Sequence, residues 1–358
     1  MRILDEHPTT HFPAPGVATA PAPPESRGLP RDDVRLLVAR PEGITHARFP
    51  DLPDHLRAGD LLVVNDSATV PGQLDAELAG RGPVVLHVAS RLAAPAPALD
   101  GADLRVVELR TAPDAHRSVL DAAPGDVLTT HGVTVTLLAP YPEASSPTGR
   151  GNRLWRAVAD GPLDRVLARR GRPISYGYLD RHHPLSAYQT VFATRPGSAE
   201  MPSAARPFTP ELVTRLVSRG VAVAPVTLHT GVSSQEAGEA PQPERFEVGA
   251  ATARLVNAVR AGGGRVVAVG TTVTRALESA VADGRLVASG GWTERVVTPA
   301  DPPRVVDGLV TGWHDPGASH LLLVEAVAGP GLTQTAYDAA VARGYRWHEF
   351  GDSALLLP

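Results

Sequence analysis

Three apolar runs, each typical of a buried strand, lead into polar residues that could do chemistry. The runs are 221–228, 265–269 and 305–310, and they lead to His229, to Gly270, Thr271 and Thr272, and to Thr311, Trp313 and His314. Histidine titrates near neutral pH, so it can take up or release a proton during a reaction. A Gly-Thr-Thr turn that opens a helix presents free backbone N–H groups, which suit a carboxylate, a phosphate or a ribose hydroxyl.

These residues would form one site if the three strands are parallel neighbours. In open α/β sheets, ligands gather outside the carboxyl ends of the strands, so His229, Thr271 and His314 would then share a cleft. The alternative is an ordinary strand-to-helix connection whose threonines only cap the helix. Two further residues are open in the same way: Glu278 either binds substrate or forms a surface ion pair with Arg275, and Trp313 either stacks on a purine or belongs to the core.

The composition sets the broad class. The chain has 358 residues, 43% of them hydrophobic and 20% charged, which is typical of a globular protein large enough for two domains. Its net charge of −4 gives no support for a nucleic-acid partner, although a local basic face is compatible with it. There is no cysteine, and the 13 histidines show no metal-binding spacing, so no metal is expected. Without an 18-residue apolar run or a signal sequence, the chain is expected in the cytoplasm with no membrane span.

The element pattern predicts an α/β protein with mixed organisation. From residue 205 on, strands alternate with helices, which indicates a largely parallel or mixed sheet covered by helices. A helix is expected from Val273 to about Asp283, closed by Gly284.

The region between about residues 70 and 160 differs. Short apolar runs recur at 84–89, 104–109, 127–130, 133–138 and 154–158, separated by turn residues such as His131-Gly132. Such spacing favours a small antiparallel β-barrel, the alternative being a decorated loop. We therefore predict a flexible Pro/Ala-rich arm over 1–30, an α/β main domain over 31–69 plus 160–358, and an inserted β-barrel domain over 70–159.

Several pieces of the chain resemble one family, the S-adenosylmethionine:tRNA ribosyltransferase-isomerases of queuosine biosynthesis. The matching pieces are Arg35–Val38, Pro50–Leu52, Gly59–Asp66, Tyr188–Val191 with Gln189, Pro202, Phe208-Thr209, Thr227–His229, Ala268–Thr272 with Arg275 and Glu278, Thr311 with His314 and Pro316, Tyr345-Arg346, and Gly351-Asp352. Their order and spacing carry the resemblance, because no single piece is decisive.

The resemblance implies an α/β domain with an inserted β-barrel. It also implies that S-adenosylmethionine is consumed as a ribosyl donor, without a metal. A base removes a proton beside the sulfonium, and the amine of a 7-aminomethyl-7-deazaguanine in a tRNA anticodon attacks the anomeric carbon. Adenine and methionine leave, and the product is epoxyqueuosine. His229 and His314 are the candidates for the base and the proton donor. Substrate contacts are expected from Thr227, Gly270, Thr271, Thr272, Arg275, Glu278, Thr311, Trp313, Tyr188, Gln189 and Asp352.

Some loops depart from the family pattern. Pro207 stands where the family has a histidine, Ala68 and Gln73 replace two arginines, Ser233–Gln235 replaces a glycine-rich turn, and Gln242-Pro243 precedes Glu244. Loops carry function more often than cores do, so a second hypothesis is a diverged enzyme with an acceptor other than tRNA. A third is a module that binds an adenosyl ligand without turnover. The oligomeric state is not set by the sequence, and a monomer is favoured.

Overall fold

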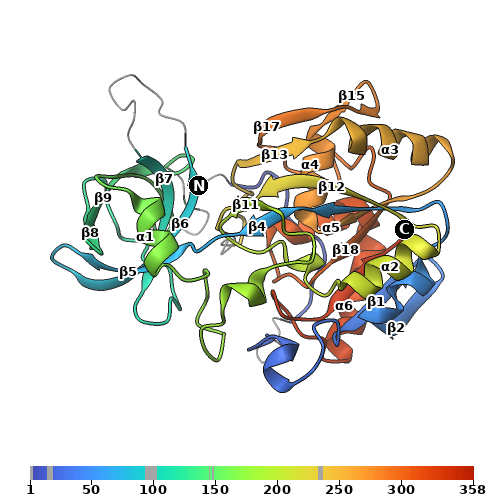
Figure 1. Cartoon of the computed structure of the whole chain (residues 1–358), viewed down its shortest axis with the longest axis horizontal. Helices are drawn as coiled ribbons and strands as arrows, with labels where there is room; N and C mark the ends of the chain where they lie inside the picture. Colours follow the sequence, from blue (N-terminus) through green and yellow to red (C-terminus); the bar gives the residue numbers. More distant parts are fainter. Residues whose placement is uncertain (1–2, 14–18, 93–102, 145, 147–148, 233–236) are drawn as a thin grey trace.

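The structure, a computed structural model, describes residues 3–13, 19–92, 103–144, 146, 149–232 and 237–358. Ser233–Gln235, which stands in place of the glycine-rich turn of the family, lies outside the described residues. Figure 1 shows two lobes, a barrel on the left and an α/β lobe on the right, so the predicted fold class is confirmed. None of the helices in the described residues has the length and apolar character needed to cross a bilayer.

The α/β lobe is built on one mixed sheet of nine strands, in the order β17-β13-β12-β3-β14-β18-β19-β1-β2. The four central strands β12, β3, β14 and β18 are parallel, whereas β13, β17, β19 and β2 include antiparallel pairings. Their bounds are β1 Arg35–Arg40, β2 Gly43–Arg48, β3 Leu61–Asn65, β12 Ala222–His229, β13 Glu244–Val248, β14 Val266–Val269, β17 Ser289–Thr293, β18 Gly308–Thr311 and β19 Ser353–Leu356.

Helices cover both faces of this sheet because the central strands β3, β14 and β18 are apolar on both sides. One face packs against α3 Ala250–Ala261, α4 Thr271–Ser279, α5 Ser319–Ala328 and α6 Pro330–Ala342. The other packs against α2 Pro210–Ser218 and the 3-10 helices η2 Phe49–His55 and η5 Ser203–Ala205. Both cores are fully buried, so the carboxyl ends of the strands are held rigidly.

The second lobe is a closed antiparallel barrel of six strands in the order β10-β7-β6-β5-β8-β9. Their bounds are β5 Gln73–Leu78, β6 Gly82–Arg91, β7 Asp103–Thr111, β8 Val127–Thr130, β9 Val133–Pro140 and β10 Leu154–Ala159. Helix α1, Leu163–Arg170, packs Leu163 and Leu167 into its core beside Trp155. The sequence indicated five of these strands, and β5 is the sixth.

The barrel is inserted between two short strands of the α/β lobe. The chain leaves along β4, Ser67–Thr69, and β11, Arg195–Ser198, pairs with β4 in parallel after the chain returns. The return path also carries the 3-10 helix η4, Leu185–Tyr188. The barrel therefore sits beside the carboxyl ends of the central strands (Figure 1). The boundaries given above for the domains stay a prediction.

The described part of the predicted N-terminal arm lies against the α/β lobe. Thr9 and Thr10 donate their backbone N–H groups to the buried carboxylate of Glu325, at 2.9 and 2.6 Å. The arm also forms a 3-10 helix, η1 Pro24–Arg27, whose Glu25 accepts a hydrogen bond from Arg206 at 2.9 Å. Prolines limit regular structure but are accepted in the first turn of a helix, which explains η1.

Two expectations about the C-terminal half were wrong. The three strands are not direct neighbours, because β3 lies between β12 and β14. The helix after Gly270 ends at Ser279 and not near Asp283, because a two-stranded hairpin follows, β15 Val281–Ala282 and β16 Arg285–Leu286. Asp283 and Gly284 both have positive φ, 49° and 72°, as the two-residue turn of a hairpin requires.

The turn before β14 offers a stability test at two glycines of the same run. A Cβ on Gly264 would lie 2.1 Å from the carbonyl oxygen of Gly59, whereas on Gly262 it would meet nothing closer than 3.5 Å. We expect Gly264→Ala to lower the free energy of unfolding by about 1–3 kcal/mol, because the two backbone segments must separate. Gly262→Ala, the matched control, should change it by less than about 1 kcal/mol in urea denaturation. Equal effects of the two variants would contradict this packing.

Candidate functional site

A cavity of about 680 Å³ lies between the barrel and the strand tips of the α/β lobe. Its volume falls within the range of small-molecule sites, about 300–1,000 Å³. Its wall is formed by Thr230 after β12, Gly270–Thr272 after β14, Thr311–Asp315 after β18, the barrel residues Arg110, His116–Ser118, Leu120 and Arg150, the connecting residues Ile174, Tyr176–Tyr178, Tyr188 and Ala199–Ala204, and His348-Glu349.

Eight of the thirteen predicted site residues line this cavity. They are Tyr188, Gly270, Thr271, Thr272, Arg275, Thr311, Trp313 and His314. The tips of the three strands therefore meet around a common hollow even though β3 lies between two of them. Their functional roles stay a prediction.

His229 is not among the lining residues. Side chains alternate along β12, and the neighbour Thr230 reaches the cavity. The ring of His229 packs on the backbone of Gly197, where an added Cβ would lie 2.7 Å from its Nδ1 atom. Burial, then Arg245 and Arg195, lower the pKa of His229. The geometry thus favours His314 over His229 as a reacting group.

The other four predicted residues hold the structure around the cavity. Gln189 pairs with the backbone of Thr69, which lines the cavity, at 3.0 and 2.7 Å. Thr227 bridges Arg195 and Asp66 at 2.8 and 2.6 Å.

Glu278 and Asp352 act on backbone segments. The carboxylate of Glu278 accepts three backbone N–H groups, from residues 304, 305 and 306, at 2.8–3.1 Å. Asp352 accepts from the Arg35 guanidinium at 2.6 Å and from the backbone of Arg346 at 2.8 Å. Asp352 therefore anchors the loop that carries His348 and Glu349.

Gly270, Thr271 and Thr272, at the N-terminus of α4, line the cavity. Gly270 precedes the helix with φ 99° and ψ 158°, a conformation that is strained for any residue with a Cβ. Further along α4, the guanidinium of Arg275 pairs with Glu244 and donates to Gln242 O at 3.0 Å. Burial raises the pKa of Glu244, and Arg275 opposes that shift. The charge of Arg275 is therefore used within the protein, beneath the cavity.

Two stacked histidines form part of the wall. The rings of His314 and His320 lie 4.9 Å apart with an angle of 11° between their planes. Nε2 of His314 is 3.0 Å from the hydroxyl of Thr311, which orients the ring. Burial lowers the pKa of His314 well below its usual value and lowers the pKa of His320 to about 4. Both rings are neutral at pH 7, so each retains a nitrogen that can accept a proton.

A second set of lining residues was missed from the sequence. Tyr176 and Tyr178 stack at 5.9 Å, and their hydroxyls donate to Glu200 and Glu349. Burial, then the neighbouring carboxylates, raise the pKa of both tyrosines well above its usual value. The aromatic residues on both sides of Gly177 are a sequence pattern that could have indicated a ligand-binding wall. No local sequence pattern indicated that Glu200 and Glu349 would lie beside them.

His348 is a further missed residue. Its ring stacks on Tyr178 at 4.7 Å and 14°, and its φ of 68° is unusual for a residue other than glycine. Such strained backbone clusters at functional sites. Among the described residues, no group of three or more His, Asp or Glu side chains is arranged to hold a metal ion.

The histidine pair gives a prediction for stability against pH. The pKa of His320 is about 4 in the folded protein and is expected near 6.5 in the unfolded chain. Between these pH values, the unfolded chain binds a proton at this histidine and the folded protein does not. We expect the free energy of unfolding to fall as pH drops through this window, by up to roughly 3 kcal/mol from His320. Urea denaturation at several pH values measures the slope. His320→Gln should flatten it, whereas His11→Gln, at an exposed histidine, should not; equal slopes in all three proteins would contradict the assignment.

Comparison with known proteins gives consistent results. The family model described as "Queuosine biosynthesis protein" matches residues 9–356. A protein of Anaeromyxobacter dehalogenans is 38% identical over 343 residues, covering 92% of this chain and 93% of that protein, and one of Thermus thermophilus is 38% identical over 340 residues, covering 92% and 94%. Both are named S-adenosylmethionine:tRNA ribosyltransferase-isomerase.

A solved structure agrees with these relatives. The S-adenosylmethionine tRNA ribosyltransferase of Thermotoga maritima has a TM-score of 0.52 and 26% identity to this chain. The similarity covers 97% of this chain and 99% of that one, so it extends over both lobes. On the family model and on relatives above 30% identity, this chain belongs to the queuosine biosynthesis protein family.

Proposed function

We propose that this protein is a transferase that uses S-adenosylmethionine as a ribosyl donor. The acceptor is a 7-aminomethyl-7-deazaguanine base in tRNA, the product is epoxyqueuosine, and adenine and methionine are released. The observation that carries the proposal is the 38% identity, over more than nine tenths of each chain, to proteins named for this activity. The cavity at the meeting point of the two lobes supplies the site.

The wall of the cavity has the chemistry that an adenosyl sulfonium needs. Free N–H groups at the start of α4 and the hydroxyls of Thr271 and Thr311 suit the ribose. The stacked rings of Tyr176 and Tyr178 provide an aromatic wall for a base. Carboxylates of Glu200 and Glu349 line the same cavity and favour a cationic sulfonium electrostatically.

We assign His314 as the base that removes the proton beside the sulfonium. It lines the cavity, is neutral at pH 7, and is oriented by Thr311 at 3.0 Å. The proton donor for the leaving adenine is then His116 or His348, since the lining His320, with a pKa of about 4, is neutral at pH 7. His229 stands outside the lining, and so we assign it no proton transfer.

The proposal has consequences for partners and location. S-adenosylmethionine is a substrate and not a resident cofactor, and the proposed reaction requires no metal. The protein would meet tRNA in the cytoplasm and would act as a monomer, since the cavity is completed by the two lobes of one chain.

The loop departures motivate one rival, an enzyme that keeps the adenosyl cavity but uses another acceptor. Incubation of the pure protein with S-adenosylmethionine, with and without tRNA bearing the deazaguanine precursor, separates the two. We expect adenine and methionine in equal amounts, and only with that tRNA. Release independent of tRNA would favour the rival, and no release under either condition would contradict both.

A further inference from the structure

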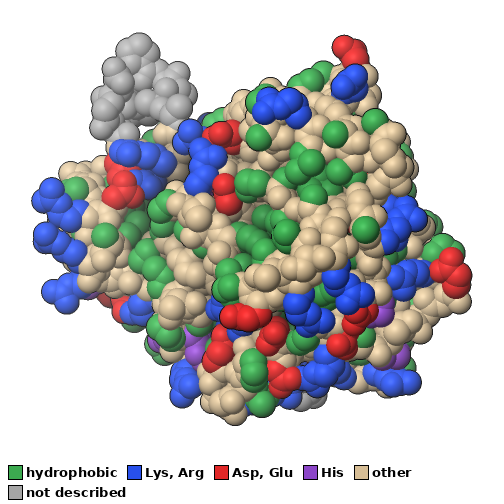
Figure 2. All heavy atoms as spheres, turned by 45° about the vertical axis from the view of Figure 1, so that its right-hand side comes forward, with side chains coloured by type: hydrophobic (Ala, Val, Ile, Leu, Met, Phe, Trp, Pro, Cys, Tyr) green, Lys and Arg blue, Asp and Glu red, His purple; other side chains and the backbone are tan. Residues whose placement is uncertain are grey.

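The two sides of the cavity carry opposite charges. The barrel contributes Arg110, Arg117 and Arg150, whereas the α/β side contributes the carboxylates of Glu200 and Glu349. Overall, acidic and basic side chains are interspersed over the surface seen in Figure 2, as the net charge of −4 leads one to expect. A polyanion would therefore be attracted to a local cluster of positive charge and not to the surface as a whole. The barrel side of the cavity carries such a cluster.

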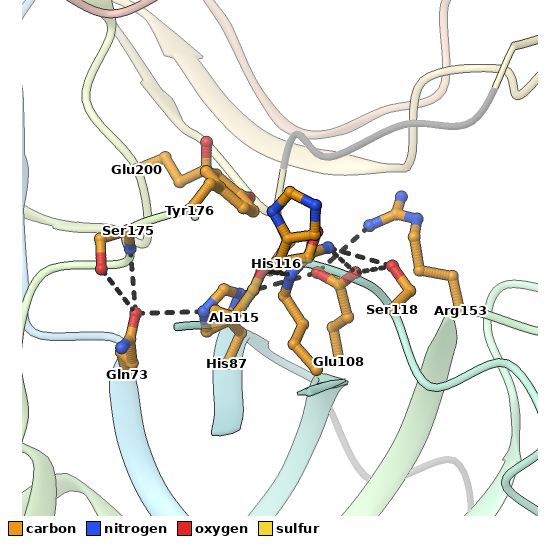
Figure 3. A network of polar contacts seen from close by, with 12 residues as sticks. Gln73, His87, Glu108, Ala115, His116, Ser118, Arg153, Ser175, Tyr176 and Glu200 are labelled. Atoms are coloured by element: carbon orange, nitrogen blue, oxygen red, sulfur yellow. Dashed lines mark hydrogen bonds and ion pairs between the residues drawn. The ribbon is translucent and has the colours of Figure 1, made fainter. Parts of the chain in front are cut away.

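A buried network fixes the barrel loop that carries Arg117, whereas Arg150 lies in the separate loop between β9 and β10. Arg110 donates from Nε to the carbonyl of Ala115 at 2.6 Å and from Nη2 to the carbonyl of His116 at 3.2 Å. Its Nη1 pairs with the fully buried Glu108 at 2.7 Å, and Ser118 donates to the same oxygen at 2.7 Å (Figure 3). The loop is thus held in one position although it lies at the surface.

The same loop reaches across to the opposite wall. Ala115 is buried with φ 56°, a strained conformation that the Arg110 bond helps to hold. The ring of His116 packs on Gly177, where an added Cβ would lie 2.7 Å from its Nδ1 atom. Gly177 stands between the two stacked tyrosines of the wall. A ligand held by this loop therefore lies directly beside the aromatic part of the cavity.

Arg110 differs from Arg117 and Arg150 in that its charge is already paired with a carboxylate of the protein. The guanidinium of Arg110 is almost completely buried and is neutralised by Glu108. Arg117 and Arg150 are exposed, and within the described residues neither guanidinium has a hydrogen-bond or ion-pair partner, although the acidic Asp114 lies in the same loop. Their charges are available to a ligand at the mouth of the cavity.

We propose that Arg117 and Arg150 bind backbone phosphates of the RNA whose base enters the cavity. This inference rests on the proposed function and adds to it the place where the polynucleotide lies. Guanidinium groups recognise phosphate by paired hydrogen bonds, and exposed ones do so without a large desolvation cost. The carboxylates on the α/β side of the cavity repel phosphates. The RNA backbone therefore runs along the barrel side while one base turns into the cavity.

The competing occupant is the carboxylate of the methionine portion of S-adenosylmethionine. A small carboxylate would be bound inside the cavity with little dependence on salt. A phosphate backbone releases counterions when it binds, so each phosphate contact adds about one unit to the slope of log affinity against log salt. Salt dependence therefore distinguishes the two occupants.

The test uses the full-length double variant Arg117→Ala/Arg150→Ala and tRNA bearing the deazaguanine precursor. Binding is followed by fluorescence anisotropy over a series of salt concentrations, and S-adenosylmethionine binding by calorimetry. We expect tRNA affinity at about 0.1 M salt to fall by roughly tenfold or more and the salt slope to fall by about 2. Affinity for S-adenosylmethionine should stay within about twofold of wild type.

The matched control is Arg165→Ala/Arg169→Ala. These two arginines are exposed on α1 of the barrel lobe and do not line the cavity, so the variant loses the same net charge. It should bind tRNA nearly as wild type does. Thermal denaturation of each variant shows that the fold is intact.

Three outcomes would overturn the inference. Equal salt slopes in the two double variants would show that Arg117 and Arg150 do not contact phosphate. A loss confined to S-adenosylmethionine would assign them to the methionine carboxylate. In the third outcome, wild-type protein releases adenine from S-adenosylmethionine but binds no tRNA at any salt concentration. That result would contradict both the tRNA acceptor and this inference. The first two outcomes contradict this inference only and leave the proposed function standing.

Discussion

Replacement of His314 by alanine should lower the turnover number by about 100-fold or more, because a positioned general base contributes about 10²–10⁴-fold. His314 lines the cavity, is neutral at pH 7, and is held by Thr311 at 3.0 Å. The affinity for S-adenosylmethionine should change much less, since the variant removes a reacting group and leaves the remaining walls in place. Steady-state adenine release and calorimetric binding measure the two quantities.

Two further variants make this result specific. His314→Gln keeps a polar side chain beside Thr311 but cannot accept the proton, so it should be as slow as the alanine variant. His229→Ala should stay within a few-fold of wild type, because His229 lies outside the cavity lining. A large loss at His229 together with a small one at His314 would contradict the assignment of the base.

Replacement of Glu108 by glutamine should lower the free energy of unfolding by about 3–5 kcal/mol, the usual result of breaking a buried ion pair. Glu108 and Arg153 are completely buried, and Arg110 is nearly so. Burial alone would raise the pKa of Glu108, but Arg153, the hydrogen bond with His87 and Arg110 hold it well below its usual value. Without this carboxylate, Arg153 keeps its ion pair with the buried Glu239, whereas Arg110 loses the carboxylate with which it pairs.

A surface pair in the same barrel is the control. Asp75 is exposed and lies 2.6 Å from the half-buried Arg172, so Asp75→Asn should cost less than about 1 kcal/mol. Urea denaturation of both variants gives the comparison. Similar costs for Glu108→Gln and Asp75→Asn would show that the buried network is not the element that holds the barrel loop.

Local pattern was enough to predict the elements, because hydrophobic periodicity is itself local. The alternation after residue 205 and the short runs of the barrel appear in the structure as α2–α6 and β6–β10. The order of strands is a long-range property, and for that reason the place of β3 between β12 and β14 was missed. The hairpin at Asp283-Gly284 was missed for another reason: its Asp-Gly signal was attributed to the end of a helix.

The candidate site was predicted in part for similar reasons. Thr271, the first residue of α4, and Thr311, the last residue of β18, reach the cavity because the carboxyl ends of the strands meet there. His229 does not, because its ring packs on Gly197 and its neighbour Thr230 lines the cavity instead. Glu200 and Glu349 come from distant loops, and only the fold brings them beside Tyr176 and Tyr178.

The central claim is that the hollow between the barrel and the strand tips binds S-adenosylmethionine and holds its ribose beside His314. A crystal structure with S-adenosylmethionine bound tests this most directly. We predict its adenosyl group against Thr271 and Thr311, with the sulfonium on the side of Glu200 and Glu349. Density for the ligand in the shallow pocket beside Trp292 and Phe246, with the hollow empty, would contradict the account.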